Sequence, residues 1–240
     1  MFEGDASRSG RFITKLSTVL SQIVDLVYPP QCLICEDRLD HAARQICVSC
    51  LCEFKLIGRL HSDFSVSGEI HLDETWPLFE FDPAFQQLIH QLKYARRRKP
   101  LIVLLNFYEP KILGMLTEKP DLVISIPLHP RKLRERGYNQ VDDMSRWLAR
   151  QLETSFGDNV VKRTRYTKSQ TKLSAQERQE NVQGAFKLQD EDAVRDAHIL
   201  LVDDVLTTGA TANAVAGVLK GAGARKIILM TLSTPLHGSA

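Results

Sequence analysis

The stretch Leu200-Leu201-Val202-Asp203-Asp204-Val205-Leu206-Thr207-Thr208-Gly209-Ala210-Thr211 decides the fold of this chain. Its first half is an apolar segment that ends on two aspartates, and its second half is a turn of small and polar residues. A helical pattern follows the turn and continues to Ala222. A continuously apolar strand that leads directly into a helix is typical of a parallel sheet with helices on both faces.

The same alternation of strands and helices extends to either side of this stretch. We expect strands at 78–81, 121–127, 160–166, 184–188, 198–205 and 226–232, helices at 83–93, 101–117, 139–152 and 210–222, and a basic loop at 127–140. This order predicts the α/β fold class, with a parallel sheet and flanking helices.

Two further segments precede the α/β region, which we place at residues 61–240. Residues 12–27 carry apolar side chains at helical spacing, and Pro29-Pro30 ends this pattern, so residues 1–30 are predicted to form an amphipathic helix that covers a core face. A partner-binding helix is the alternative. Residues 31–60 contain all the cysteines and form a separate module.

The bulk composition limits the class of protein. Hydrophobic residues make up 43% of the chain and charged residues 25%, with a net charge of +2, which is typical of a globular protein. No apolar run approaches the roughly 20 residues of a membrane-spanning helix. The N-terminus lacks the basic start of a secretory signal. We therefore expect a cytoplasmic protein without a membrane-spanning segment.

The turn after the apolar strand has the chemistry of a phosphate site. At the carboxyl end of a parallel strand, its backbone N–H groups and hydroxyls can wrap a phosphate, and the following helix adds the positive end of its dipole. The turn residues are Thr207, Thr208, Gly209, Ala210 and Thr211. Asp203 and Asp204 would then reach vicinal hydroxyls of a sugar attached to that phosphate. Ordinary helix capping is the alternative. A nucleotide-binding Rossmann motif fits poorly, because the chain has neither Gly-x-Gly-x-x-Gly nor a Walker sequence.

Positive charge is concentrated in the middle of the chain. Between Lys93 and Arg136 there are eleven Lys or Arg residues against four Asp or Glu. Within the basic loop, Arg131, Arg134 and Arg136 are candidates for phosphate or diphosphate contacts, with a solvated basic turn as the alternative. Lys93 and Tyr94 precede Arg96 to Arg98, and this pairing of cations with a ring suits a groove for single-stranded nucleic acid. A solvated helix end explains the same residues.

The cysteine module has the spacing of a metal site. Cys32-x2-Cys35 and Cys47-x2-Cys50 each place two thiolates on a tight turn, and together they complete a tetrahedral sulfur site that suits Zn²⁺. Four protein ligands leave no open position, so the zinc would be structural. Disulfides are less consistent with a reducing cytoplasm, and a redox dithiol is less consistent with two such pairs. Cys52 is left over as a bystander.

Residues 200–211 resemble the signature of type I phosphoribosyltransferases. The resemblance implies that the chain binds phosphoribosyl diphosphate with Mg²⁺, and that the fold is the parallel sheet of that class. Asp203 and Asp204 would then hold the ribose 2′- and 3′-hydroxyls, and residues 207–211 would cradle the 5′-phosphate. The supported chemistry is displacement of diphosphate at the anomeric carbon, through a transition state with oxocarbenium character.

Nearly the whole sequence resembles the ComF family. The ordered elements are the four cysteines, Ile89 to Tyr94, Ile126-Pro127, Arg136 to Gln140, Arg165, Gln170-Thr171-x-Leu173, Arg178, Asn181, Ala185-Phe186 and the phosphate turn. This resemblance implies a role in DNA uptake during natural transformation, with single-stranded DNA and a helicase-like protein as partners. The chain would act either as a phosphoribosyltransferase on an unidentified acceptor or as a non-catalytic ligand sensor. A transcription regulator is the third possibility, but the sequence has no evident helix-turn-helix.

Overall fold

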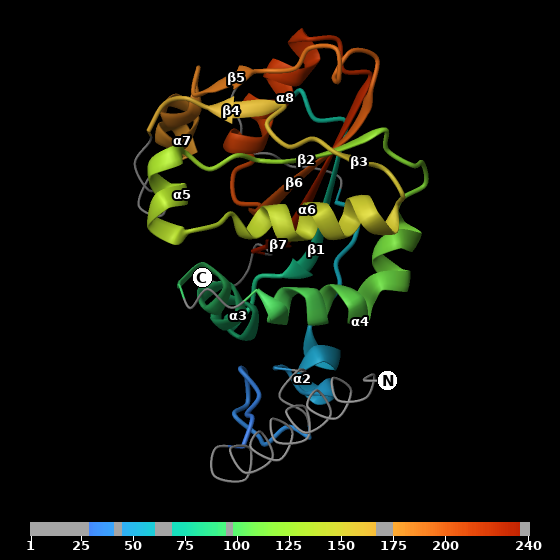
Figure 1. The fold of residues 1–240 in the computed structure, drawn as a ribbon, viewed down its shortest axis with the longest axis vertical. Helices are drawn as coiled ribbons and strands as arrows, with labels where there is room; N and C mark the ends of the chain where they lie inside the picture. Colours follow the sequence, from blue (N-terminus) through green and yellow to red (C-terminus); the bar gives the residue numbers. More distant parts are fainter. Residues whose placement is uncertain (1–28, 41–44, 61–68, 95–97, 167–174, 236–240) are drawn as a thin grey trace, which may run out of the picture. The chain divides into compact units, whose positions relative to one another are not determined.

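A parallel sheet forms the framework of the larger part of the chain, and within the described residues it has five strands in the order β1-β7-β6-β2-β3 (Figure 1). The strands are β1 (Glu74–Glu80), β2 (Leu122–Ser125), β3 (Ser155–Phe156), β6 (His198–Val205) and β7 (Lys226–Thr234). Every pairing is parallel, so all carboxyl ends of the strands lie at one edge. The predicted α/β fold is therefore confirmed.

The computed structural model describes residues 29–40, 45–60, 69–94, 98–166 and 175–235. The chain divides into two compact units, Met1–Leu51 and Cys52–Ala240. The amphipathic helix that we predict at 12–27 lies outside the described residues. None of the helices within the described ranges combines the length and the apolar character that crossing a membrane requires.

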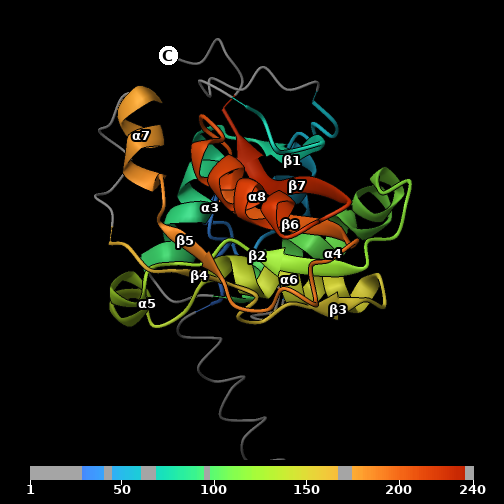
Figure 2. The same ribbon diagram turned by 90° about the horizontal axis from the view of Figure 1, so that it is seen from above.

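Helices cover both faces of the sheet, as its apolar central strands require (Figures 1 and 2). The helices are α3 (Pro83–Tyr94), α4 (Lys99–Met115), α5 (Pro130–Arg136), α6 (Gln140–Gln151), α7 (Ala175–Val182) and α8 (Ala210–Gly221). On one face, Ile199 and Leu201 of β6 share a core with Val215 and Leu219 of α8. On the other face, α6 packs against β2, β3 and β6, and α4 packs against α6.

A two-stranded antiparallel ribbon lies apart from the main sheet. It pairs β4 (Val161–Arg163) with β5 (Phe186–Leu188), and Figure 2 shows it between α5 and α8. Along β4, Val161 and Arg163 are buried while Lys162 is exposed. This alternation directs the side chain of Arg163 inward, toward the same side as the buried valine.

Two predicted elements differ from the observed ones. Residues 130–136 form the helix α5 instead of part of a loop, because His129 caps its first turn, Pro130 is a favourable first residue, and Gly137 ends it at φ 81°. Strand β1 begins at Glu74, four residues before the predicted start, and thereby pairs with most of β7.

An extended segment before β1 is fastened to α8, the helix that follows the phosphate turn. The Asn213 side chain accepts a hydrogen bond from the backbone N–H of His71 (2.8 Å) and donates one to the carbonyl of Glu69 (2.9 Å). A side chain at Gly217 would bring Cβ within 2.9 Å of the His71 ring, so the His71 ring would have to shift to admit one. These contacts hold α8 in place behind the turn.

The smaller unit is described over residues 29–40 and 45–51. A bridge joins Gln31 to Arg38 around a tight turn, and the short helix α2 (Val48–Glu53) begins directly after Cys47. The two Cys-x2-Cys pairs lie on this turn and at the start of this helix.

Candidate functional site

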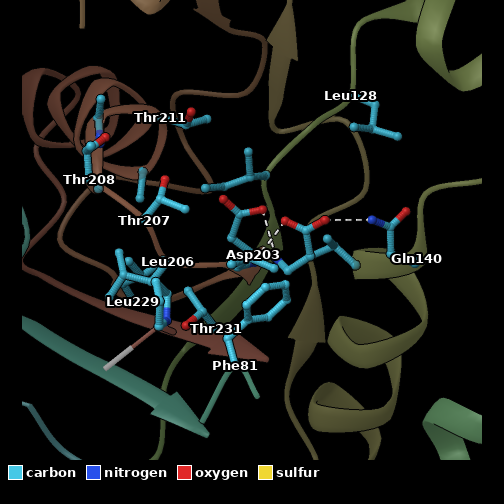
Figure 3. Close-up of a pocket in the computed structure, with 18 of the residues that line it drawn as sticks. Phe81, Leu128, Gln140, Asp203, Leu206, Thr207, Thr208, Thr211, Leu229 and Thr231 are labelled. Carbon is cyan, nitrogen blue, oxygen red and sulfur yellow. Dashed lines mark hydrogen bonds between the residues drawn. The ribbon is translucent and has the colours of Figure 1, made fainter. Parts of the chain in front are cut away.

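A cavity of about 810 Å³ opens at the carboxyl ends of the strands (Figure 3). Its wall combines the residues after β1, those after β2, the end of β6 and the turn before α8. This is the position at which open α/β sheets bind ligands. The cavity therefore forms where several strand ends converge, and each supplies polar groups.

The two aspartates line this cavity from the end of β6, and Figure 3 shows the side chain of Asp203 there. Asp203 accepts a hydrogen bond from the backbone N–H of Asp204 (2.8 Å). Asp204 accepts one from the N–H of Val205 through Oδ1 and one from the Gln140 side chain through Oδ2, both at 2.8 Å. The N-cap position of α8 is Gly209, so neither aspartate occupies it.

The turn between β6 and α8 lines the cavity with all its predicted residues. These are Thr207, Thr208, Gly209, Ala210 and Thr211. Gly209 has φ 77°, in the left-handed region that favours glycine, and it is the N-cap of α8 without a side-chain cap of its own. The first residues of the twelve-residue helix α8 line the cavity, and the N–H of Ala210 donates a hydrogen bond to the Thr208 hydroxyl (3.4 Å). The positive end of the α8 dipole therefore lies at the cavity.

The basic helix α5 contributes some of its cations to the cavity and keeps others outside. Lys132 and Arg136, one helical turn apart, line the wall, whereas Arg131 and Arg134 are not among the lining residues. Arg131 forms an ion pair with Glu135 (3.2 Å) and lies over the ring of Tyr166. Of the arginines predicted to contact diphosphate, the structure thus places Arg136 at the cavity, and it adds Lys132.

The other basic segment, at the end of α3, is described only in part. The side chains of Lys93 and Tyr94 and the whole of residues 95–97 lie outside the described residues. Arg98 forms a two-point ion pair with Asp143, with Nε and Oδ2 2.6 Å apart. This pairing raises the pKa of Arg98 and partly neutralises its charge. Arg98 therefore contributes less to a nucleic-acid groove than the basic run implies.

Arg163 is a site residue that the sequence did not reveal. It lines the cavity from β4, its side chain is 6% exposed, and its guanidinium lies 5.2 Å from the Phe186 ring centre. Burial lowers its pKa, and the negative charge of Asp203 opposes that shift. A cation held out of water beside the acidic pair gives the cavity a second kind of polar group. The alternation along β4, which turns Arg163 inward, was the only sequence signal for this site residue. It is a weak signal because the strand has three residues.

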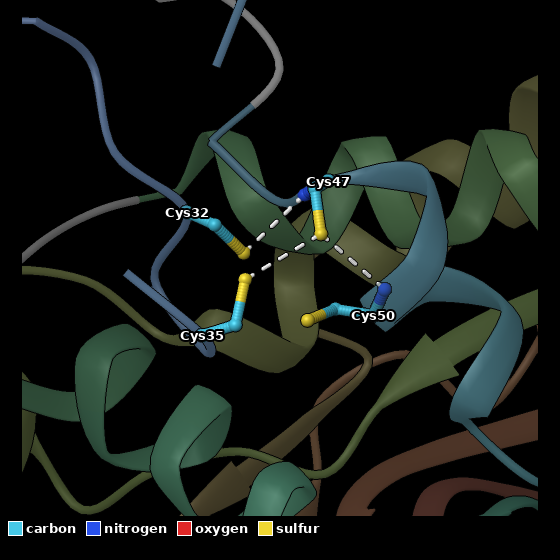
Figure 4. Close-up of side chains that lie close together, drawn as sticks. All are labelled: Cys32, Cys35, Cys47 and Cys50. Atoms are coloured by element: carbon cyan, nitrogen blue, oxygen red, sulfur yellow. Dashed lines mark hydrogen bonds between the residues drawn. The ribbon is translucent and has the colours of Figure 1, made fainter. Parts of the chain in front are cut away.

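The four predicted cysteine ligands converge in the smaller unit (Figure 4). The sulfur atoms of Cys32, Cys35, Cys47 and Cys50 all lie within 4.8 Å of one another, and those of Cys35 and Cys47 are 3.7 Å apart. A tetrahedral site with zinc–sulfur bonds of about 2.3 Å has sulfur–sulfur edges of about 3.8 Å. The cluster can therefore hold a metal ion.

Backbone N–H groups surround this sulfur cluster. Cys32 accepts from the N–H groups of Cys47 (3.3 Å) and Ile34 (3.5 Å), and Cys47 accepts from that of Cys50 (3.4 Å). Burial raises the pKa of the Cys32 thiol, but these backbone donors outweigh burial and lower the pKa to about 7. Such donors stabilise thiolates, which are the form that binds metal ions.

The sheet, the cavity and the phosphate turn define a phosphoribosyltransferase-type protein. The model of the phosphoribosyl transferase domain family matches residues 144–239. Among solved structures, adenine phosphoribosyltransferase from Leishmania donovani aligns over 83% of this chain and 85% of its own, with 11% identity and a TM-score of 0.37.

Proteins of similar sequence identify the particular family. The DNA utilization protein YhgH of Shigella flexneri is 31% identical over 230 residues, which cover 88% of this chain and 100% of that protein. YhgH of Escherichia coli K12 is 30% identical over the same shares. Competence protein F of Haemophilus influenzae is 39% identical over 45% of this chain and 48% of its own. The chain belongs to the ComF family and carries a phosphoribosyl transferase domain.

Proposed function

We propose that this ComF-type protein binds phosphoribosyl diphosphate together with Mg²⁺ in the cavity at the carboxyl ends of the strands. One observation carries the proposal: the acidic pair, the phosphate turn and the cations of α5 all line the same cavity. Each part suits one part of the ligand. Carboxylates accept hydrogen bonds from sugar hydroxyls, a helix N-terminus binds a phosphate, and Arg and Lys bind a diphosphate.

The roles of the residues follow from these chemistries. Asp203 and Asp204 hold the ribose hydroxyls, and residues 207–211 hold the 5′-phosphate at the start of α8. Arg136 and Lys132 reach the diphosphate from α5, which also lines the cavity. When Mg²⁺ is bound with the ligand, it neutralises charge on the diphosphate and favours its departure from the anomeric carbon.

A role in DNA uptake is the second part of the proposal. It is supported by the relatives, which are called DNA utilization protein and competence protein F. The partners would be single-stranded DNA and a helicase-like protein, in the cytoplasm. The cations of α5 that lie outside the cavity wall, Arg131 and Arg134, and the half-exposed ring of Tyr166 would make the backbone and base contacts, and Arg131 would exchange its contacts with Glu135 and the Tyr166 ring for them.

A phosphoribosyltransferase acting on an unidentified acceptor is the alternative. The size of the cavity favours it, because about 810 Å³ lies in the upper part of the roughly 300–1,000 Å³ that small-molecule sites span. That volume leaves space for an acceptor beside the sugar phosphate. Diphosphate release that depends on added DNA or a free base, together with a phosphoribosylated product, would establish transfer, because hydrolysis by water releases diphosphate without an acceptor. No acceptor-dependent release would favour a non-catalytic ligand sensor.

Calorimetric titration with phosphoribosyl diphosphate and Mg²⁺ tests the binding proposal. We expect saturable binding by the wild-type protein and its loss in Asp203→Asn/Asp204→Asn, because the amides present hydrogen-bond donors to the sugar and carry no charge. Asp192→Asn is the matched control, since its side chain is 89% exposed and forms an ion pair with nearby Arg195. Binding that survives in the double variant would overturn the proposed site.

Single-stranded DNA binding is tested separately from ligand binding. We expect an affinity that falls steeply with salt, since backbone contacts release counterions, and a shallower salt dependence in Arg131→Gln/Arg134→Gln. A wild-type protein that binds phosphoribosyl diphosphate but no DNA would remove this part of the proposal alone.

For the cysteine cluster, we propose a structural Zn²⁺ ion bound by Cys32, Cys35, Cys47 and Cys50. The four-sulfur donor set and the short sulfur–sulfur distances support this metal. Elemental analysis of the purified protein should give about one zinc ion per chain, as one closed site requires.

A further inference from the structure

Gln140 connects the two sides of the cavity through its side chain. Its Nε2 donates a hydrogen bond to Oδ2 of Asp204 (2.8 Å), as Figure 3 shows, and its Oε1 accepts one from Nη1 of Arg136 (3.4 Å). The amide therefore uses its donor toward the acidic pair and its acceptor toward the basic helix.

The position of Gln140 is fixed by the local structure. It is the first residue of α6 and is 3% exposed. The preceding residue, Asn139, caps α6 and donates hydrogen bonds to the carbonyl of Ile126 (3.3 Å) and the carboxylate of Asp142 (2.8 Å). The start of α6 is thus tied to the end of β2, and the Gln140 side chain has little freedom beyond its two partners.

The second oxygen of Asp204 is held independently by the main chain. Oδ1 accepts from the N–H of Val205 (2.8 Å), so the two oxygens of this carboxylate have different partners. Gln140 and the main chain at Val205 therefore each hold one oxygen of this carboxylate.

We infer that Gln140 is a positioning residue that couples ligand binding at Arg136 to ligand binding at Asp204. The inference rests on the proposed function. An anion that binds the Arg136 guanidinium immobilises it, and the immobilised guanidinium holds the Gln140 amide, which holds the Asp204 carboxylate. Because this ordering is completed by the first ligand group, the second group binds to a site that is already arranged.

The two halves of the proposed ligand are the probes. Ribose 5-phosphate occupies the turn and the acidic pair, and inorganic diphosphate with Mg²⁺ occupies the cations of α5. The measured quantity is the ratio of the ribose 5-phosphate affinities with and without saturating Mg²⁺-diphosphate, by calorimetry on the full chain. Direct effects between the two ligands contribute equally in all variants. A change in the ratio therefore measures the part of the coupling that passes through the protein.

Gln140→Met removes the donor and the acceptor while it keeps the length of the side chain. We expect the ratio to fall by about five-fold or more, the lower end of common coupling factors. Gln151→Met is the matched control, with the same substitution at the other end of the same helix. It should leave the ratio at the wild-type value. A Gln140→Met ratio equal to that of wild type would overturn the inference.

Gln140→Glu keeps the test decisive if the methionine variant does not fold. This variant retains an acceptor for Arg136 but places a second carboxylate against that of Asp204. The affinity ratio should therefore fall at neutral pH, because the two negative charges repel each other. It should recover at acid pH, where the two carboxylates share a proton. A pH-independent loss would indicate a structural role and would also overturn the inference. If the wild-type protein binds neither probe, the proposed function itself fails, which is a different result from equal ratios.

Discussion

A buried arginine is the least expected residue of the site. Arg163 is 6% exposed and lines the same cavity as Asp203, whose negative charge acts on it, and its guanidinium lies 5.2 Å from the Phe186 ring centre. Removing a cation from water is costly unless its partners compensate, and a buried charge is therefore weak evidence for a stabilising role. We therefore expect Arg163 to contact the ligand.

Replacing Arg163 by methionine separates these roles. In Arg163→Met we expect the free energy of unfolding to change by less than about 1 kcal/mol, because an apolar side chain of similar length replaces a buried charge. The affinity for phosphoribosyl diphosphate should fall about ten-fold or more, as expected for the loss of a charge-assisted hydrogen bond. Urea unfolding and calorimetry measure the two quantities.

Lys162→Met is the control on the same strand, since Lys162 is exposed. A purely structural Arg163 would give the reverse pattern, with a destabilisation of about 3–5 kcal/mol and an unchanged affinity per folded molecule.

At the residue level, sequence and structure agree best where the site is contiguous. The aspartates and the turn residues lie within one short stretch, so their spacing in the chain already predicts a common cavity. Gln140, Lys132 and Arg163 join them only through the packing of α5, α6 and β4, which no local pattern encodes. The missed residues are therefore those that tertiary structure brings in.

Among the elements, long apolar ones were predicted well and short polar ones were not. Strands β6 and β7 and helices α4, α6 and α8 have buried residues at regular spacing. Helix α5 has no buried residue within its seven described positions, so it has no apolar periodicity to detect. The sequence signals for this helix are confined to its two ends, at Pro130 and Gly137. Strand β3, with two residues, lies below the length at which alternation can be seen.

The junction between β6 and α8 depends on one backbone conformation. Gly209 has φ 77°, which an L side chain adopts at a cost of about 1–2 kcal/mol. In Gly209→Ala we expect a destabilisation of about that size and a weaker affinity for phosphoribosyl diphosphate, because the turn and the first N–H groups of α8 shift together. Thermal unfolding and calorimetry measure the two effects.

Gly114→Ala is the control, because we expect it to change the stability of the protein in the opposite direction. Gly114 lies within α4, and an added Cβ would meet nothing within 4 Å. Alanine there should stabilise the protein by about 0.5–1 kcal/mol, since glycine is the poorer helix former. Equal effects of both alanine substitutions would contradict the role given to Gly209.

At the level of the whole molecule, the two units carry different spectroscopic probes. Both tryptophans, Trp76 and Trp147, are buried in the larger unit, whereas four of the five cysteines belong to the smaller one. Chelation of the proposed zinc should expose four additional thiols to a thiol reagent without changing tryptophan emission. The physical reason is that the metal supplies the folding free energy of the small module only.

Cys52→Ser serves as the control, because it removes the reaction of the thiol reagent with the fifth cysteine, which is exposed. A tryptophan emission that shifts in step with thiol exposure would show that the metal supports the sheet as well. Unchanged thiol reactivity after chelation would exclude a metal site at the four cysteines.

The pairing of β1 with β7 has a consequence for the order in which a newly made chain can fold. Ile227 donates to Asp73, 154 residues away in the sequence, and β7 is inserted between β1 and β6. At about 5–20 residues per second, a ribosome needs about 8–30 s between making these two positions. During that interval β1 lacks β7, although Leu56 and Leu60, which precede it in the chain, can already form their antiparallel bridges to it. Its apolar residues can then bind a chaperone or aggregate. A chain cut short before Lys226 would contain the whole acidic pair and phosphate turn, and yet lack the strand that completes their sheet.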